Sequence, residues 1–267
     1  MQARTLTVAA VAVLNTGDAG DKARASRSAA RDWQSGAITD IGNDPPPDRP
    51  ARPERPQLLM PRDMPRRRSG RGPSARIALL HAIAHIELNA IDLAWDLIAR
   101  FAGAGLPREF FDDWVRVADE EAKHFDLLNE RLHTLGSSYG ALPAHDGLWE
   151  AAEATAHDLL ARLAVVPLVL EARGLDVTPA MIARMEQFGD EETASILRIV
   201  YQDEITHVAA GMRWFTFECA RRACQPDTAW RGLVAKHFNG QLKAPFNEQA
   251  RTAAGFPKAY YQYGPRS

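Results

Sequence analysis

Two Glu-x-x-His motifs constrain this chain more than any other feature of its sequence. Glu121 and His124 form the first motif, and Glu204 and His207 form the second. Residues three apart share one face of a helix, so each motif places a carboxylate beside an imidazole. Both motifs lie in long segments whose apolar residues recur at helical spacing. One such motif carries little information, but its recurrence indicates a shared site.

A lone glutamate stands in the apolar stripe of the helical segment before each motif. Glu87 precedes Glu121 by 34 residues, and Glu171 precedes Glu204 by 33. This pattern predicts an internal repeat of two helical hairpins related by a pseudo-two-fold axis. Any one of these polar residues alone would be an ordinary buried or edge group. Their matched spacing on four helices favours a common site.

The six side chains match the ligand inventory of ferritin-like di-iron and di-manganese proteins. Their four carboxylates carry negative charge that two divalent cations would balance, and without metal such a group would destabilise a core. Mixed oxygen and imidazole donors suit iron or manganese better than structural zinc. The predicted cofactor is two iron ions, with manganese or a mixed Mn/Fe pair as alternatives. The predicted metal ligands are Glu87, Glu121, His124, Glu171, Glu204 and His207.

Helical periodicity covers most of the chain, and no segment alternates with strand period. The predicted fold class is all-α: a ferritin-like four-helix bundle with an extended Pro/Arg-rich N-terminal arm and a short C-terminal helix plus tail. The predicted parts are an N-terminal helical segment and arm at 1–74, the bundle at 75–225, and a C-terminal helix and tail at 226–267. Long helices are expected at 75–104, 107–136, 148–173 and 190–224.

Shorter elements complete this prediction. Gly174 is expected to end the third long helix, and Thr178 with Pro179 predicts the start of a further short helix. Pro167 predicts a kink or bulge within the third long helix. The tail from Asn239 onward is expected to be irregular. Other short helices are predicted at 5–14, 18–34 and 228–238.

Several residues beside the motifs are secondary candidates. Glu120 and Asp203 could each accept the second imidazole N–H of a motif histidine, and solvated helix-face charges are the alternative. Tyr201 lies one turn before Glu204 and could donate a hydrogen bond or carry a radical, but core packing is favoured. It is the one candidate for a catalytic side chain beyond the metal centre. His81 and His85 are excluded as ligands, and Trp114 and Trp214 are expected to be core residues.

The stretch from residue 44 to residue 74 differs sharply in composition. It holds nine of the 17 prolines, and nine arginines fall between Arg49 and Arg76. Such a composition predicts an extended, polyproline-like arm. Its cluster Arg66, Arg67 and Arg68 could bind phosphate or RNA. The favoured interpretation is a strap whose arginines pair with acidic side chains of the bundle.

Charge and cysteine content limit the partners and the compartment. A net charge of -2 gives no field that requires nucleic acid or an anionic membrane. The apolar run at 5–14 is too short to span a bilayer and lacks a signal-peptide cleavage site. Cys219 and Cys224 match neither a Cys-x-x-Cys pair nor a zinc ribbon, so reduced thiols are expected. These features predict a cytoplasmic protein without a membrane partner.

The sequence resembles a bacterial ferritin-like family designated domain of unknown function 455. The resemblance covers nearly the whole chain, including the arm and Pro245-Phe246-Asn247 of the tail. It implies a di-metal centre in which Glu121 and Glu204 bridge the metals, while each remaining Glu and His pair binds one metal. The runs that carry it are His85-Ile86-Glu87-Leu88, Ala90-Ile91-Asp92-Leu93, Glu120-Glu121-Ala122-Lys123-His124-Phe125, Glu171-Ala172-Arg173-Gly174-Leu175-Asp176 and Asp203-Glu204-Ile205-Thr206-His207-Val208.

More distant kinship to ferritin-like oxidases and hydroxylases implies oxygen chemistry. The leading hypothesis is therefore an O2-activating di-iron oxidoreductase that oxidises or hydroxylates a small organic molecule with electrons from an external donor. One alternative is metal handling by a ferroxidase, storage protein or peroxide scavenger. Others are a tRNA-modifying hydroxylase, suggested only by the arginine cluster, and a bundle that metal merely stabilises. The sequence does not specify the oligomeric state, and a homodimer is one option.

Overall fold

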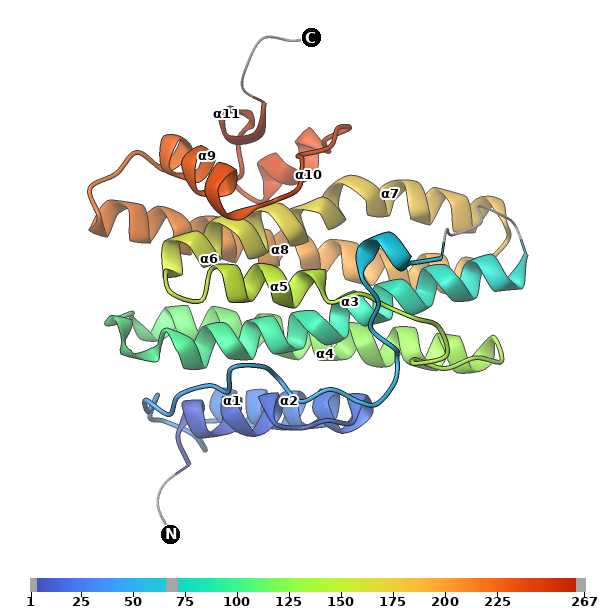
Figure 1. Ribbon diagram of the computed structural model, residues 1–267, viewed down its shortest axis with the longest axis horizontal. Helices are drawn as coiled ribbons and strands as arrows, with labels where there is room; N and C mark the ends of the chain where they lie inside the picture. The colour runs from blue at the N-terminus through green and yellow to red at the C-terminus, as the bar shows by residue number, and fades with distance from the viewer. Residues whose placement is uncertain (1–3, 66–71, 263–267) are drawn as a thin grey trace. The chain divides into compact units, whose positions relative to one another are not determined.

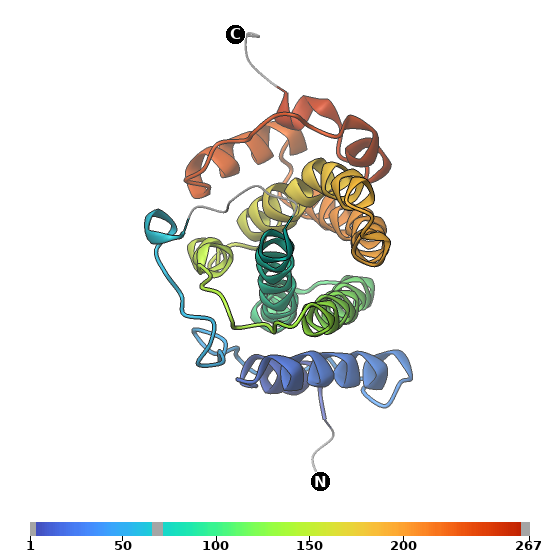
Figure 2. The ribbon, with the colours of Figure 1, turned by 90° about the vertical axis from the view of Figure 1, so that its right-hand side faces the viewer.

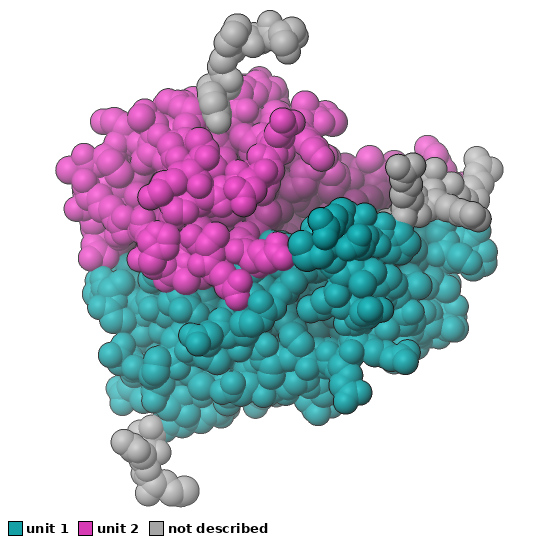
Figure 3. Space-filling model, viewed as in Figure 1, with its two compact units in different colours: residues 1–149 teal, residues 150–267 magenta. Residues whose placement is uncertain are grey.

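The structure is a computed structural model that describes residues 4–65 and 72–262. Within these ranges the chain is helical and forms no β-strand, and Leu58 and Ala144 make an isolated bridge. The predicted all-α class is therefore confirmed. The chain divides into two compact units, residues 1–149 (unit 1) and 150–267 (unit 2), coloured separately in Figure 3. Each unit contains one of the two predicted Glu and Glu-x-x-His hairpins, and the partition into arm, bundle and tail stays a prediction.

Unit 1 is built on a hairpin of two long helices, α3 (Pro73–Arg100) and α4 (Arg108–Thr134). Helix α1 (Leu6–Leu14) packs on α3, and α2 (Ala19–Gln34) packs on α4, so these helices form a layer beside the hairpin (Figures 1 and 2). Ser26 of α2 joins the two layers. Its hydroxyl donates to the Ala118 carbonyl at 2.9 Å and accepts from Trp95 Nε1 at 2.8 Å. Two short 3₁₀ helices complete the unit, η1 (Pro61–Asp63) and η2 (Ala102–Ala104).

Unit 2 is built around α8 (Glu191–Arg221), the longest helix of the described chain. Helices α6 (Leu159–Val165), η3 (Val166–Glu171) and α7 (Ala172–Gln187) follow one another and pack along α8. The end of the chain adds α9 (Pro226–His237), α10 (Glu248–Ala253) and α11 (Lys258–Tyr261). Helix α9 packs on α6, and α10 packs on α7 and α8. The remaining helix, α5 (Gly147–Ala154), begins before the boundary of the units and ends after it.

The predicted helices at 5–14, 18–34, 75–104, 107–136, 190–224 and 228–238 are confirmed apart from small shifts at their ends. Their local signals explain this success. Pro73 is the first residue of α3, where its missing N–H costs no intrahelical bond. Gly136 follows α4 with a left-handed φ of +76° that glycine adopts readily. Asp190 caps α8 by accepting from the Thr193 N–H at 3.1 Å.

The predicted helix at 148–173 is wrong in its extent. It is interrupted after Ala154, because Asp158 starts a new helix by accepting from the Leu160 N–H at 3.0 Å. Gly174 does not end it either, since α7 continues to Gln187. The expected helix start at Thr178 and Pro179 is therefore also wrong, and the described tail is not irregular throughout, since it forms α10 and α11.

The bulge predicted from Pro167 is confirmed. Residues Val166–Glu171 form a π-helical segment, which ends at the predicted ligand Glu171. Gly211 of α8 faces this segment. A Cβ placed on Gly211 would lie 2.5 Å from Pro167 Cβ and 3.4 Å from Leu168 Cδ2. The lack of a side chain at Gly211 therefore allows α8 to approach the π-helical segment closely.

Helix α3 is long and apolar enough to cross a membrane when judged by length and composition alone. However, 72% of its most apolar 18-residue window is buried within the protein. Core helices pass the same test, so this property is weak evidence for a membrane span. The cytoplasmic location stays a prediction.

Candidate metal centre

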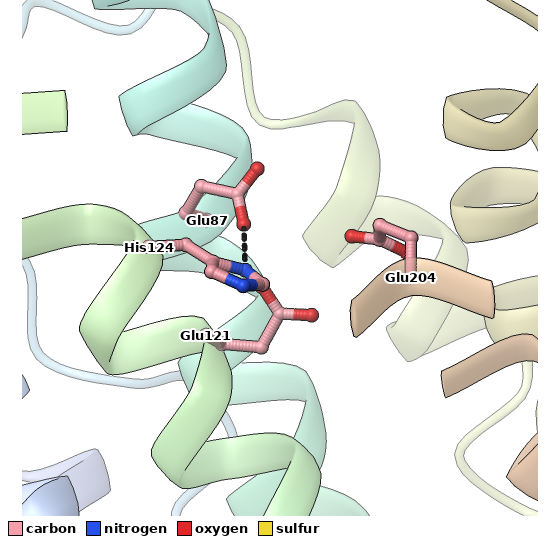
Figure 4. Close-up of side chains that lie close together, drawn as sticks. All are labelled: Glu87, Glu121, His124 and Glu204. Carbon is pink, nitrogen blue, oxygen red and sulfur yellow. Dashed lines mark hydrogen bonds and ion pairs between the residues drawn. The ribbon is translucent and has the colours of Figure 1, made fainter. Parts of the chain in front are cut away.

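Unit 1 brings three of the predicted ligands together at the level where α3 and α4 face each other. Glu87 comes from α3, and Glu121 and His124 come from α4; all three are buried. Their ligand atoms lie within 4.8 Å of one another. His124 Nδ1 lies 3.1 Å from Glu87 Oε2 and 3.6 Å from Glu121 Oε2, and Figure 4 shows the contact with Glu87. We call these three residues the unit 1 cluster.

Two carboxylates in such a dry place oppose each other's ionisation. Burial, reinforced by the negative charge of Glu121, raises the pKa of Glu87 to about 8, while the hydrogen bond with His124 acts in the opposite direction. A divalent cation among the three side chains would supply the positive charge that this arrangement lacks. Carboxylate and imidazole donors are also the ligands that iron and manganese accept. The unit 1 cluster therefore fits a metal ion by charge and by donor type.

Unit 2 repeats the Glu-x-x-His part of this arrangement on α8. Glu204 and His207 are both buried, and His207 Nδ1 lies 3.9 Å from Glu204 Oε2. In both units, then, the Nδ1 nitrogen faces the glutamate three residues earlier. Glu171 is half-buried at the last position of the π-helical segment. A Cβ on Gly174, three residues later, would lie 4.0 Å from Glu204 Cγ and Cδ, so the start of α7 lies against the Glu204 side chain.

The tail supports α7 at a point one turn after Glu171. Pro179 lies inside α7 and lacks the N–H that the Leu175 carbonyl would otherwise accept. Asn247 replaces that donor: its Nδ2 donates to the Leu175 carbonyl at 3.0 Å. The same amide nitrogen donates to the Tyr201 hydroxyl at 2.9 Å. One tail residue therefore connects the turn after Glu171 to the turn before Glu204.

A buried ion pair holds this part of the tail in place. Arg251, which is 3% exposed, donates to both carboxylate oxygens of Asp176 at 2.8 and 2.7 Å. The backbone N–H of Asn247 donates to Asp176 Oδ1 at 2.9 Å. The Arg251 guanidinium also lies 4.5 to 5.2 Å from the ring centres of three tail residues, in a cation–π arrangement. These rings belong to Phe246, Phe256 and Tyr261.

Replacing Asn247 with alanine is expected to lower the free energy of unfolding of unit 2 by roughly 1–2 kcal/mol. The change removes the donor for the Leu175 carbonyl and also the cap of α10, because Asn247 Oδ1 accepts from the Ala250 N–H at 3.1 Å. Urea denaturation followed by circular dichroism measures the loss. Asn239→Ala is the matched control at an exposed tail position. Equal midpoints for the two variants would contradict this role of Asn247.

The other residues that the sequence analysis singled out beside the motifs differ in their contacts and burial. Glu120 lies 3.6 Å from Arg116, and Asp203 is half-buried on α8. Their expected hydrogen bonds to the motif histidines stay predictions. The Tyr201 hydroxyl accepts from Asn247, in agreement with the favoured interpretation of a satisfied hydroxyl. Trp114 and Trp214 are buried, as expected of core residues.

The sequence interpretation did not assign a role to Asp176, Asn247 or Arg251. Asp176 and Asn247 lie within runs that carry the family resemblance, but their contacts join residues 71 to 75 positions apart. The available signal was Pro179. A proline inside a long amphipathic helix leaves a carbonyl that needs a donor from elsewhere in the chain, and the side-chain amide of an asparagine can be that donor.

Fold and site together define an all-helical protein with a buried cluster of glutamate and histidine that could hold a metal ion. Residues 15–262 match the family described as protein of unknown function (DUF455), and the chain belongs to this family. An uncharacterized protein of Haemophilus influenzae is 45% identical over 211 residues, which are 76% of this chain and 72% of that protein. No solved structure matches the chain. The family expected from the sequence is confirmed, and its ferritin-like kinship stays a prediction.

Proposed function

We propose that the protein is a ferritin-like di-iron oxidoreductase that uses O2 to oxidise or hydroxylate an organic substrate. In this proposal the unit 1 cluster and the unit 2 residues Glu171, Glu204 and His207 hold two metal ions jointly. Helices α3, α4 and α8, with η3 and α7, form the four-helix bundle around them. Iron is the preferred metal, and manganese or a mixed Mn/Fe pair is the alternative.

The observation that carries this proposal is the unit 1 cluster itself. Two carboxylates and an imidazole lie buried with their ligand atoms within 4.8 Å of one another. Without a bound cation, such a cluster would destabilise the folded protein, because buried charges of the same sign oppose folding. The repetition of Glu-x-x-His on α8 supports a second metal of the same kind.

Bound iron would supply the electrons for O2 reduction. The protein side chains would hold the iron and exclude bulk water from the site. The four glutamates neutralise the metals, and the two histidines complete the donor set. Apolar residues on the same helices keep bulk water away, which strengthens electrostatic interactions in the site. Six of those with no exposed surface are Leu80, Ala84, Ile91, Ala118, Phe125 and Val208.

Anaerobic loading with ferrous iron, followed by removal of free metal, is expected to leave about two iron ions per chain. Glu121→Gln should reduce this ratio to less than one, because it removes a charged ligand from the centre of the site. Glu130→Gln is the matched control, an exposed glutamate on the same helix that should keep the full ratio. Elemental analysis measures the ratio, and stopped-flow absorbance after mixing with O2 tests for oxygen chemistry.

Glu204→Gln tests whether the two units share one site. It should reduce the iron content as strongly as Glu121→Gln does. Full iron content in Glu204→Gln would show that unit 2 does not take part. A wild-type protein that retains no iron, or that shows no optical change on mixing with O2, would contradict the proposed function.

A further inference from the structure

A second candidate site lies within unit 1, on a face of α3 formed by residues other than Glu87. It is a partly open cavity of about 350 Å³ lined mainly by three segments. Helix α3 provides Ala78, Ala82 and Ile86 as its floor. The loop that follows α4 provides one wall, with Leu142 and Pro143, and the arm provides the other through residues 64–65.

The walls of the cavity are fastened to each other and to its floor. The Leu59 N–H donates to the Ala144 carbonyl at 2.8 Å, and the Ala144 N–H donates to the Gln57 carbonyl at 3.0 Å, which joins arm and loop. His81 Nε2 accepts from the Gly140 N–H at 2.9 Å, which joins the loop to α3. These bonds hold a preformed shape, as ligand cavities usually have.

Three histidines line this cavity, and two of them, His81 and His85, hydrogen-bond the loop that follows α4. His85 Nε2 lies 3.0 Å from the His145 carbonyl oxygen. His85 Nδ1 lies 2.8 Å from the Tyr139 hydroxyl. His81 Nε2 accepts from the Gly140 N–H. The Tyr139 ring stacks on the His81 ring with centroids 5.3 Å apart. The imidazoles of His81 and His85 therefore hold the loop.

The cavity also carries no permanent charge. Among the described residues that line it, none is a lysine, arginine, aspartate or glutamate. A charged ligand would lose its hydration here without gaining an opposite charge. A volume near the lower end of the usual range for ligand cavities also excludes a polymer.

We propose that this cavity binds a small, uncharged and largely apolar organic molecule. Three observations carry the proposal: apolar walls held by backbone hydrogen bonds, the hydrogen bonds of His81 and His85 to the loop, and a described lining without lysine, arginine, aspartate or glutamate. Ile86, 48% exposed on the floor, gives such a molecule an apolar surface to cover. None of the proposed metal ligands lines the cavity, so its binding test uses the metal-free protein.

The uncharged fluorescent probe N-phenylnaphthylamine tests this proposal with the full-length, metal-free protein. Its fluorescence should rise saturably, with one molecule bound per chain. Ala82→Phe fills the cavity from its floor and should weaken binding by about tenfold or more. Ala78→Leu, a smaller change on the same floor, should weaken it in the same direction. Ala75→Phe is the matched control, a half-buried alanine of α3 outside the lining, and should stay within about twofold of wild type.

A charged probe provides an independent test of the proposal. Anilinonaphthalene sulfonate has similar rings and a negative charge, and it should bind about tenfold more weakly or worse. Circular dichroism confirms that each variant is folded. Non-saturable binding, equal affinity for the two probes, or unchanged affinity in both folded variants Ala82→Phe and Ala78→Leu would overturn the proposal. None of these results bears on iron content, which tests the proposed function separately.

Discussion

Replacing Asp92 with alanine is expected to lower the free energy of unfolding by about 3–5 kcal/mol. Asp92 of α3 is fully buried and forms ion pairs with two cations at once. Lys22 Nζ of α2 lies 2.5 Å from its Oδ1, and Arg52 Nη1 of the arm lies 3.1 Å from its Oδ2. Burial lowers the pKa of Lys22 and raises that of Asp92, and the attraction between them opposes both shifts. Without Asp92, the buried Lys22 ammonium keeps only the Ala51 carbonyl, 2.9 Å away.

Urea denaturation measures this loss, and an exposed ion pair provides the control. Glu186 pairs with Arg198 where both side chains are more than 40% exposed, so Glu186→Ala should cost less than about 1 kcal/mol. A second comparison separates the loss of the Lys22–Asp92 attraction from the cost of leaving the Lys22 ammonium buried without a partner carboxylate. The double variant Lys22→Met, Asp92→Leu should lose less stability than Asp92→Ala, because no buried ammonium remains. Similar losses for Asp92→Ala and Glu186→Ala would contradict the role given to this network.

Gly211→Ala is expected to lower the stability of unit 2 by about 2 kcal/mol and to reduce its metal content. The added Cβ would lie 2.5 Å from Pro167 Cβ and 2.8 Å from Pro167 Cγ, in a ring that cannot rotate away. Helix α8 must then move away from the π-helical segment. Because Glu171 ends that segment and His207 lies one turn before Gly211, the movement also changes their spacing.

The same substitution at Gly232 is the matched control. Gly232 lies inside α9, and a Cβ there meets nothing within 4 Å. Gly232→Ala should therefore stabilise the protein by about 1 kcal/mol through helix propensity alone. The two glycine variants should shift the denaturation midpoint in opposite directions. Stabilisation by Gly211→Ala, or unchanged iron content in that variant, would show that the close approach does not position the ligands.

The sequence predicts the motif-bearing helices well because their signals are local. Apolar periodicity marks the buried face of α4 and α8, and caps such as Asp190 mark their ends. The same periodicity places Glu87, Glu121 and His124 on facing sides of one hairpin, where the structure brings them together. These conclusions needed only residues that are near in sequence or repeat at a fixed interval.

The segment from α6 to α7 was predicted poorly because its conformation depends on distant residues. Gly174 and Pro179 have the local properties of helix ends. The helix continues through both, and at Pro179 the lost N–H is replaced by Asn247, which donates to the Leu175 carbonyl from 72 positions away. The sequence analysis predicted that arginines of the arm pair with acidic side chains of the bundle. Arg52 does pair with an aspartate, but no sequence signal indicated that this partner, Asp92, is buried. The cluster Arg66, Arg67 and Arg68 lies outside the described residues.

The donation from Asn247 to Leu175 has a consequence for the order in which the protein matures. Synthesis proceeds from the N-terminus, so α7 and α8 leave the ribosome before Asn247 exists to complete α7. The unit 1 cluster lies on α3 and α4, which are made early. In the proposed function, these three side chains would therefore be made before the unit 2 ligands. The hydrogen bonds of Asn247 to Leu175 and Tyr201 can form only after the segment that contains Asn247 has been made, so the proposed centre would require this segment to be intact.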